Sequence, residues 1–261
     1  MTMSITLHVG RGEHRGPLTV FPIWRQHSEG PEVTLADASD LRIGELVEPS
    51  VPHLQVTAIG RHPVLLLDGD LLVGGLQDRV AFGSRLLAAG RPTTIDVRCV
   101  EQERWHGSAN HELAGRASSL VRGNSDQQEV WRRVDVERAR RHRIPDVGGL
   151  ELMPGQSGVM IGIGGRPMLI ELFATNAMLS AAWPRILAAA AAEAAGRPGK
   201  PTAGWRARQF VAVVDNMRIT HSPEEAQTVL SAVSGPFELR GIADGDRLLH
   251  ASVINREAWA A

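Results

Sequence analysis

Glycines divide residues 17–105 into apolar runs that are too short to form helices. Between two of these runs lies Asp68-Gly69, a hairpin signal, because glycine accepts the positive φ that a tight turn requires. A second break follows at Gly74-Gly75. Repeated turns between short apolar runs predict a mostly antiparallel sheet that folds into a sandwich-like layer.

Residues 93–100 show the clearest strand pattern in this part of the chain. Thr93, Ile95, Val97 and Cys99 fall on one face of an extended segment, so this face is predicted to be core and the opposite face partly solvated. Cys99 is the only cysteine, which excludes an intramolecular disulfide. A single cysteine on an apolar strand face is typical of inert core rather than of a nucleophile.

The pattern changes after residue 105. The sequence predicts a loop with a short helix over 106–124, a helix capped by Ser125 or Asp126, and later a helix capped by Thr175 that Pro184 kinks or restarts. Hairpins are expected at Gly164-Gly165 and Asp244-Gly245, whereas 224–233 remains ambiguous between helix and strand.

These elements predict an α+β fold in which the antiparallel, sandwich-like sheet packs against a smaller mixed portion of helices and hairpins. We expect three parts: a polar N-terminal segment (1–16), a β-rich part (17–105) and a mixed α/β part (106–261) that forms one continuous domain with the β-rich part.

Charge and hydropathy limit the partners. The chain has 28 basic and 29 acidic residues and a formal net charge of -1, which argues against a protein that coats nucleic acid or anionic lipid. The most apolar long stretch, 186–195, is shorter than the roughly 20 residues that span a bilayer. We therefore expect a cytoplasmic protein without a membrane partner, and the sequence leaves a homo-oligomer open.

Two residue patterns that often mark functional sites are not supported by the sequence around them. Glycines 162, 164 and 165 lie between two strands, whereas a nucleotide-binding glycine loop opens a helix, so a hairpin explains them better. His106, His111 and Glu112 offer metal-binding side chains, but their spacing matches no metal motif. No metal site is predicted, and the sequence names no cofactor.

The segment 65–79 is more informative. A hairpin turn explains Asp68 and Gly69, but it does not explain a double glycine followed by Gln77, Asp78 and Arg79 inside otherwise apolar sequence. A double glycine lets another backbone or a ligand come close. Both a purely structural turn and a functional cluster remain open at this point.

The segments LLLDGDLLVGGLQDRV (65–80) and IDVRCVEQERW (95–105) resemble motifs of a bacterial and archaeal family. This is the ARPP family, named for its association with ADP-ribosylglycohydrolases and rhodanese-phosphatases. The similarity continues in Gln127-Gln128-Glu129-Val130-Trp131, in 168–173 and in Trp183-Pro184, and it covers about 15–255. This chain has Asp78 where the family usually has Asn, and Asp70 where it usually has Glu.

The family name records which genes lie near those of its members. The resemblance therefore implies an association and not a mechanism, because fold or family does not determine chemistry. It points to metabolism linked to ADP-ribose or NAD, or to a stress response, and it supplies no established catalytic residues. One hypothesis is a small-molecule-binding protein or enzyme of unknown reaction that acts on a nucleotide-like or other phosphorylated ligand. The alternative is a non-catalytic adaptor that binds a neighbouring enzyme through Trp183, Trp205 and Trp259.

The first hypothesis assigns roles to the two central motifs. Asp70 and Glu101 would bind a ribose-like hydroxyl or act as acid and base, Arg79 and Arg104 would face an anion, and Trp105 would stack on a base. Gly74, Gly75, Gln77 and Asp78 complete the ligand-binding set. If the double glycine reverses the chain, Arg79 begins a strand beside the end of 93–101, within ion-pair reach of Asp78, Glu101 or Asp70.

Overall fold

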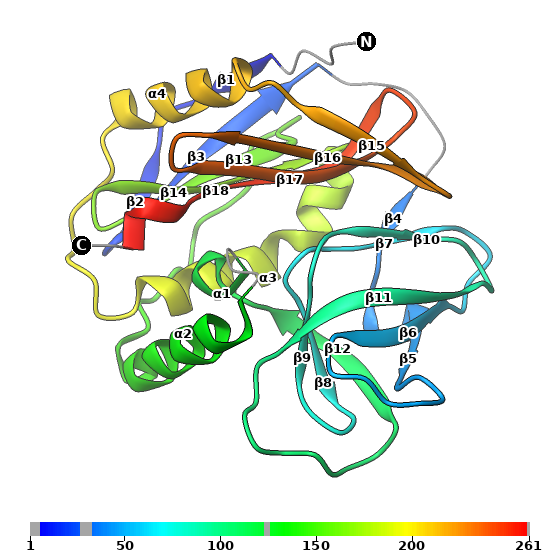
Figure 1. The fold of residues 1–261 in the computed structure, drawn as a ribbon. Helices are drawn as coiled ribbons and strands as arrows, with labels where there is room; N and C mark the ends of the chain where they lie inside the picture. Colours follow the sequence, from blue (N-terminus) through cyan, green and yellow to red (C-terminus); the bar gives the residue numbers. More distant parts are fainter. Residues whose placement is uncertain (1–5, 27–32, 123–125, 260–261) are drawn as a thin grey trace. The chain divides into compact units, whose positions relative to one another are not determined.

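The computed structural model describes residues 6–26, 33–122 and 126–259. The chain divides into two compact units (Figure 1). One unit comprises Met1–Gly30 and Arg140–Ala261, and the other comprises Pro31–Ala139. The chain therefore leaves the first unit, builds the second, and returns to the first. Both units contain mostly antiparallel sheets and a few helices, which confirms the predicted α+β class.

The 31–139 unit is built around a closed barrel whose neighbouring strands are all antiparallel. In barrel order its strands are β11 (Pro92–Cys99), β6 (His53–Ala58), β5 (Leu41–Gly44), β12 (Asn110–Arg116), β8 (Asp70–Gly74) and β9 (Arg79–Ala81). Beside it lie the small sheet β10 (Arg85–Leu87), β7 (Val64–Leu66) and β4 (Thr34–Leu35), and the helices η1 (Ala38–Asp40), α1 (Ser119–Arg122) and α2 (Gln127–Arg140). Closure leaves the barrel strands no open edge.

Alternation along the barrel strands directs every second side chain into one apolar core. On β11 the buried side chains are Ile95, Val97 and Cys99, as the sequence predicts, while Thr94 and Asp96 are exposed. Ile95 and Val97 meet residues from all the other barrel strands in the same cluster. The barrel interior is thus filled by side chains.

The turn at Asp68-Gly69 exists, but the hairpin predicted there is wrong. Gly69 has φ +85°, and the Asp70 N–H donates to the Leu67 carbonyl at 3.0 Å. However, β7 pairs with β10 and β4, whereas β8 pairs with β12 and β9. The polar groups of the turn bind residues further along the chain: the Gly69 N–H donates to Ala81 O, and the Asp68 N–H donates to Ser84 Oγ. These contacts carry the chain from one sheet to another.

The loop predicted over 106–124 is also corrected, because this segment contains β12 and α1. In β12, His111 and Leu113 are buried, and the pairing with β8 then shifts register between Leu113 and Gly115. This bulge interrupts the period of two that would have revealed a strand. Asp126 caps α2 as predicted, since its Oδ1 accepts from the Glu129 N–H at 2.9 Å. Ser125 lies outside the described residues.

The other unit contains one antiparallel sheet flanked by two helices. Its order is β1 (Leu7–Val9), β3 (Leu18–Arg25), β13 (Gly158–Ile163), β14 (Arg166–Phe173), β18 (Arg247–Asn255), β17 (Phe237–Asp244), β16 (Gln227–Ser234) and β15 (Thr220–Glu224), with β2 (Glu13–Arg15) paired to β3. Its helices are η2 (Arg141–Arg143), α3 (Asn176–Ala194), α4 (Gly204–Asp215) and η3 (Arg256–Trp259). Figure 1 shows α4 and α3 on opposite faces of this sheet.

Local signals in this unit are mostly confirmed. The β13–β14 and β17–β18 hairpins turn at Gly164-Gly165 and Asp244-Gly245. The Thr175 side chain accepts from the Met178 N–H at 3.1 Å and caps α3. The ambiguous residues 224–233 belong to β15 and β16. No new helix begins at Pro184, because α3 continues through it.

None of the helices in the described part of the chain is long and apolar enough to cross a membrane.

Candidate functional site

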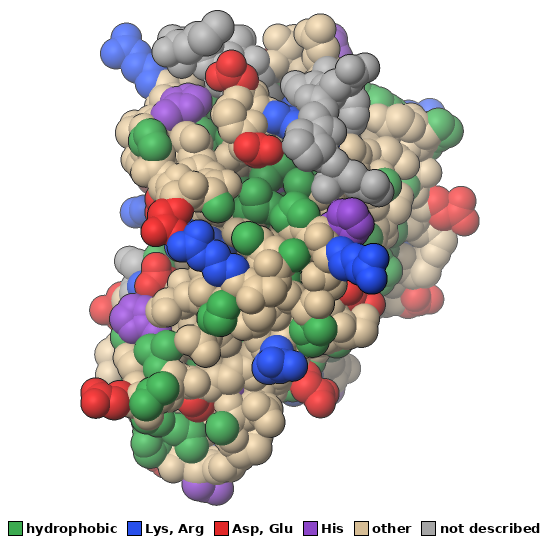
Figure 2. All heavy atoms as spheres, turned by 90° about the vertical axis from the view of Figure 1, so that its right-hand side faces the viewer, with side chains coloured by type: hydrophobic (Ala, Val, Ile, Leu, Met, Phe, Trp, Pro, Cys, Tyr) green, Lys and Arg blue, Asp and Glu red, His purple; other side chains and the backbone are tan. Residues whose placement is uncertain are grey.

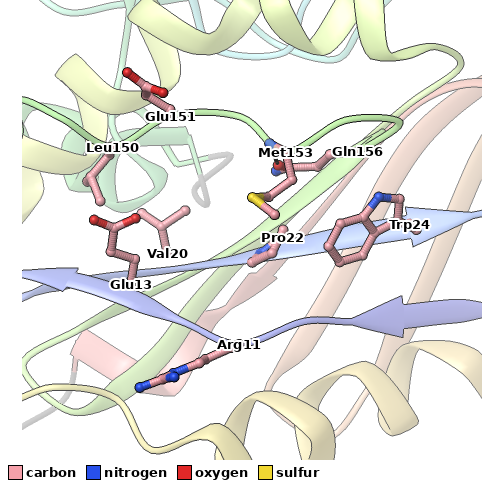
Figure 3. Close-up of a pocket in the computed structure, with 9 residues that line it drawn as sticks. All are labelled: Arg11, Glu13, Val20, Pro22, Trp24, Leu150, Glu151, Met153 and Gln156. Atoms are coloured by element: carbon pink, nitrogen blue, oxygen red, sulfur yellow. Dashed lines mark hydrogen bonds between the residues drawn. The ribbon is translucent and has the colours of Figure 1, made fainter.

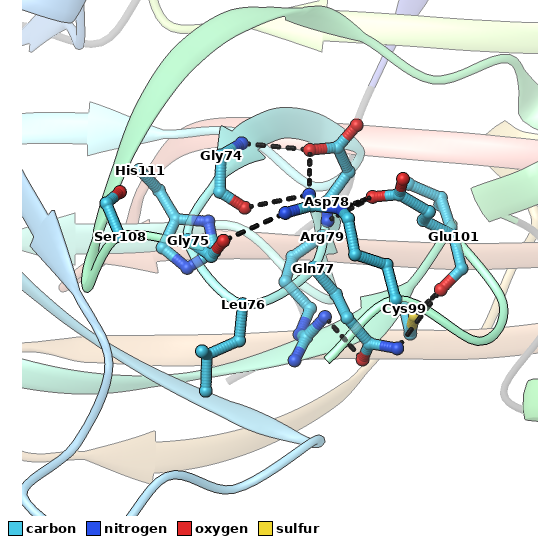
Figure 4. A network of polar contacts seen from close by, with 12 residues as sticks. Gly74, Gly75, Leu76, Gln77, Asp78, Arg79, Cys99, Glu101, Ser108 and His111 are labelled. Atoms are coloured by element: carbon cyan, nitrogen blue, oxygen red, sulfur yellow. Dashed lines mark hydrogen bonds and ion pairs between the residues drawn. The ribbon is translucent and has the colours of Figure 1, made fainter. Parts of the chain in front are cut away.

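The two central sequence motifs meet at one end of the barrel, as predicted. Strand β8 runs into Gly74-Gly75, and β9 returns antiparallel to it with Leu72 opposite Arg79. Strand β9 also pairs with the end of β11, with Arg79 opposite Cys99. The turn that joins β8 and β9 therefore lies beside the loop 100–109 that follows β11 (Figure 4).

Arg104 joins this turn to this loop. Its Nε donates to Glu101 Oε2 at 2.6 Å, and its Nη2 donates to Asp78 Oδ1 at 3.0 Å. Its Nη1 and Nη2 also donate to the carbonyls of Gly75, His106 and Gly74 at 2.9, 3.1 and 3.1 Å. A guanidinium has five N–H donors, so protein acceptors occupy all of them. No donor of Arg104 is left for an anion in this arrangement, and its predicted role as an anion ligand stays a prediction.

Asp78 and Glu101 are both acceptors for this arginine. Asp78 Oδ1 also accepts from the Gly74 N–H at 2.8 Å, and Glu101 Oε2 accepts from the Asp78 N–H at 3.2 Å. Both bonds of Asp78 Oδ1 need only an oxygen acceptor, which the usual asparagine also supplies. Burial raises the pKa of Glu101, but hydrogen bonds from Arg104 and Asp78 outweigh it and hold this pKa below its ordinary value.

We expect acid to remove the stabilising effect of Glu101. Because its pKa in the folded protein is lowered, the ionised carboxylate contributes stability above its ordinary pKa of about 4.3, and this contribution declines as the pH falls through the lowered value. In urea titrations, the difference in unfolding free energy between the wild type and Glu101→Gln should be full at about pH 6 and shrink toward about pH 3.

The matched control for this pH series is Glu103→Gln, which changes an exposed carboxylate two residues away. It should leave the wild-type pH profile unchanged. A pH-independent difference between the wild type and Glu101→Gln would contradict the ion pair.

The double glycine is explained by protein packing. Gly74 and Gly75 have φ of +104° and +52°, in the region that favours glycine. A Cβ on Gly75 would lie 2.0 Å from His111 Nε2, and one on Gly74 would lie 3.0 Å from Asn110 O. The group that approaches the glycines is therefore β12, and a direct ligand contact for them is not needed.

Arg79, unlike Arg104, has hydrogen-bond donors without a partner in the described structure. Its side chain is fully buried, and its Nη1 donates to Gln77 Oε1 at 2.8 Å. Gln77 in turn donates from Nε2 to the Glu101 carbonyl at 3.2 Å. Nε and Nη2 of Arg79 have no partner among the described residues. Figure 4 shows the guanidinium directed toward Gln77, so the ion pair predicted between Arg79 and Asp78, Glu101 or Asp70 is replaced by an amide contact.

The surroundings of Arg79 are electrostatically unusual. Burial is the largest influence and lowers its pKa, while interactions with Cys99 and Glu45 act in the opposite direction without offsetting it. Above the guanidinium lies Trp105, whose ring centroid is 5.7 Å from the Arg79 Cζ and which is 47% exposed. A buried cation is thus covered on one side by an accessible aromatic ring.

Glu45 and His111 form a second polar pair at the same barrel end, and the sequence analysis missed it. Glu45 Oε1 lies 3.1 Å from His111 Nε2 and also accepts from the Leu76 N–H at 3.2 Å. The two side chains are 4% and 0% exposed. Glu45 Oε2 and His111 Nδ1 have no partner in the described part of the protein. Glu45 carried no local signal, and the bulge in β12 concealed the inward direction of His111.

Asp70 lies apart from this cluster. It begins β8 whereas Gly74 ends it, and four residues of strand span about 13 Å. Asp70 is fully buried, its Oδ2 accepts from the Leu67 N–H at 2.9 Å, and Arg116 is its cross-strand partner. The structure therefore does not bring Asp70 together with Glu101. Their catalytic roles stay predictions, and the idea that they share one site is wrong.

Other motif residues stabilise the end of β11. Gln127 Oε1 accepts from the Cys99 N–H at 3.0 Å, and its Nε2 donates to the Cys99 carbonyl at 2.7 Å. The Cys99 thiol is fully buried and donates to the Glu101 carbonyl at 2.8 Å. Gln127 thus connects α2 to the barrel. Across the described ranges, no group of three or more His, Cys, Asp or Glu side chains has the geometry to hold a metal ion.

The other unit contains a separate hollow of about 140 Å³. Its apolar wall comes from Val20, Pro22, Trp24 and Met153, and Arg11 lies at its rim (Figure 3). The polar atom of the tryptophan is satisfied, since Nε1 donates to Pro154 O at 3.0 Å. This hollow offers apolar surface without an unsatisfied buried side-chain group.

The surface in Figure 2 shows acidic and basic side chains interspersed on the face that is drawn, with hydrophobic side chains between them. This mixture agrees with the nearly balanced numbers of basic and acidic residues.

Comparison with known protein families identifies a relationship over most of the chain. A family model described as ARG and Rhodanese-Phosphatase-superfamily-associated Protein domain matches residues 6–147 and 146–254. No curated protein and no solved structure matches the chain.

Proposed function

The chain belongs to the ARG and Rhodanese-Phosphatase-superfamily-associated Protein family, and we propose that it is a small-molecule-binding protein whose 31–139 unit holds an anionic ligand on Arg79. The observation that carries this proposal is a fully buried guanidinium whose Nε and Nη2 have no partner among the described residues. Buried polar groups are nearly always satisfied, so such a pair of orphan donors calls for an occupant.

The free atoms of Arg79 form one edge of the guanidinium. Nε–H and the nearer Nη2–H point in parallel directions, which matches the two oxygens of a carboxylate or phosphate. Gln77 holds the opposite corner through Nη1 and so fixes the orientation of this edge. Arg79 would therefore bind an oxyanion through two parallel hydrogen bonds.

Trp105 adds an aromatic surface above the same guanidinium. Indole rings stack readily on nucleobases, and the 47% exposure of Trp105 leaves ring surface for such a contact. The family description names an association with ARG and rhodanese-phosphatase proteins. ADP-ribose, NAD and nucleotides are therefore the anions to test first.

Access to Arg79 requires movement, because its side chain is fully buried. The covering segment that lacks regular structure is the loop 100–109, which carries Trp105 and is attached to the barrel turn through Arg104. In this proposal the loop opens to admit the ligand. Arg104 is then a positioning residue of the cover and does not bind the anion.

Arg79→Met tests the proposal directly. By isothermal titration with ADP-ribose, AMP and inorganic phosphate, we expect the variant to lose at least about 30-fold in affinity, since truncating one partner of a buried charged hydrogen-bonded pair costs about 2 kcal/mol or more. The stability of the folded protein should change little, because methionine fills similar volume and the removal of a buried charge offsets the lost hydrogen bond to Gln77.

The control is Arg98→Met, one position from Cys99 on the opposite face of β11, where the guanidinium lies 4.1 Å from the Phe82 ring centroid. This variant should bind like the wild type. The proposal is wrong if no anion binds the wild type, or if Arg79→Met binds as tightly as the wild type.

One of the three tryptophans predicted to form the docking surface of an adaptor is buried. Trp183 is buried, and its Nε1 donates to the Leu150 carbonyl at 3.0 Å. Trp205 is 57% exposed, and the side chain of Trp259 lies outside the described residues. Trp183 therefore cannot contribute to a docking surface.

A further inference from the structure

We infer that the ligand of Arg79 carries a hydroxyl group near its oxyanion, and that Glu45 binds this hydroxyl while His111 holds Glu45 in place. The inference rests on the proposed anion site and specifies its ligand as a hydroxylated anion of the sugar-phosphate or hydroxy-acid type.

Glu45 and His111 lie at the end of the barrel that contains Arg79. Strand β5 ends at Gly44, and the Glu45 N–H donates to the Ala109 carbonyl at 3.0 Å, beside the start of β12. His111 is opposite both Ile43 of β5 and Gly74 of β8. The backbone pairing thus places Glu45 and His111 at the barrel end where β8 turns toward Arg79.

Several buried side-chain atoms at this end of the barrel lack a hydrogen-bond partner in the described structure. Nε and Nη2 of Arg79, Oε2 of Glu45 and Nδ1 of His111 are buried and have no partner among the residues that the structure describes. These four atoms belong to three side chains at the barrel end where β8 turns into β9. Such clustering indicates a shared occupant more strongly than a single orphan atom does.

Glu45 and Arg79 carry opposite charges but do not bind each other directly in the described structure. The Glu45 charge acts on the buried guanidinium, yet no hydrogen bond joins the two side chains in the described structure. A bridging group between the two side chains would satisfy Oε2 of Glu45 together with Nε and Nη2 of Arg79. The bridge must accept from Arg79 and donate to Glu45.

A hydroxylated anion meets both requirements. Its oxyanion accepts from Nε–H and Nη2–H of Arg79, and its hydroxyl donates to Glu45 Oε2. Glu45 Oε1 already accepts from Leu76 N–H and faces His111 Nε2, so the carboxylate is fixed with Oε2 as its free atom. If His111 donates from Nε2, its neutral ring leaves Nδ1 as an acceptor, which suits a second hydroxyl.

The test uses pairs of anions that share one carbon skeleton, and only one member of each pair carries hydroxyl groups. Isothermal titration of the wild-type protein compares glycolate with acetate, and glycerol 3-phosphate with propyl phosphate. In the pair whose oxyanion fits the site, the hydroxylated member should bind at least about tenfold more tightly, because a site built for a hydroxyl rejects the analogue that lacks it. The two pairs together distinguish a carboxylate from a phosphate.

Glu45→Gln supplies the residue-specific result. It keeps the shape and one oxygen acceptor but removes the negative charge near Arg79. We expect the preference for the hydroxylated member to fall below about threefold, while the plain anion binds at least as tightly as before, since a repulsive charge is gone. The control Glu112→Gln changes an exposed carboxylate adjacent to His111 and should preserve the preference.

The outcomes separate this inference from the proposed function. Equal affinity within both pairs for the wild type, or an unchanged preference in Glu45→Gln, overturns the hydroxyl contact and leaves the anion site standing. If neither member of either pair binds while ADP-ribose, AMP or phosphate does, the hydroxyl inference is overturned; if none of these anions binds, or if Arg79→Met does not weaken binding, the anion site itself fails. The wild-type comparison decides the inference even if Glu45→Gln does not fold.

Discussion

Gly75→Ala should destabilise the 31–139 unit by about 2–5 kcal/mol, from the cost of a left-handed alanine and of overpacking. The added Cβ would lie 2.0 Å from Nε2 and 2.3 Å from Cε1 of His111, at a backbone φ of +52°. The imidazole is fully buried and bound to Glu45, so a shift away from the added Cβ would break this contact. Urea unfolding monitored by circular dichroism measures the loss.

The control for this substitution is Gly90→Ala in the same unit. Gly90 has φ +69°, and a Cβ there meets no heavy atom within 4 Å. It therefore carries the left-handed cost of about 1–2 kcal/mol without the clash. The difference between the two variants isolates the contact with His111. Equal destabilisation would show that His111 does not lie against Gly75.

The second large effect is expected for Arg104→Ala, which should cost about 2–4 kcal/mol. The substitution removes five hydrogen bonds and leaves the carboxylates of Asp78 and Glu101, 35% and 28% exposed, without their cation. Water can solvate part of these groups, so the estimate lies below the cost of breaking a fully buried pair. Urea titration again supplies the measurement.

Arg132→Ala is the matched control for Arg104. Its guanidinium also binds a carboxylate, that of Glu129, but its side chain is 66% exposed. Exposed ion pairs contribute little to stability, so this variant should remain close to the wild type. A similar, small loss in both variants would mean that Arg104 does not hold the loop 100–109 against the barrel turn.

Local sequence predicted several of the strands and helix starts, although it missed β12 and left 224–233 undecided. The alternation of Ile95, Val97 and Cys99 fixed the buried face of β11, and the Thr175 hydroxyl fixed the start of α3. Gly74-Gly75 predicted the reversal that places Arg79 beside Cys99. These features depend on side-chain period, backbone sterics and capping within a few residues, and those interactions are encoded by neighbouring positions.

The pairing of strands that are distant along the chain could not be predicted from the sequence. The turn at Asp68-Gly69 was predicted, but its flanking strands joined different sheets because Ala81 and Ser84 supplied the partners for the turn. Closure into a barrel depends on how all six strands fit together, and no single segment specifies it. The prediction that 17–105 and 106–261 form one continuous domain stays a prediction.

The candidate site shows the same division. The sequence predicted one polar cluster because two motifs of unusual polarity lay at strand ends, and the structure separates Asp70 from the other members. The predicted members were Asp70, Gln77, Asp78, Arg79, Glu101 and Arg104. Only the tertiary structure decided which arginine is saturated and which is free, and it added Glu45 and His111, which are 66 positions apart. Hydrogen-bond partners depend on distances and angles across the closed barrel, and residue type and spacing along the chain do not contain them.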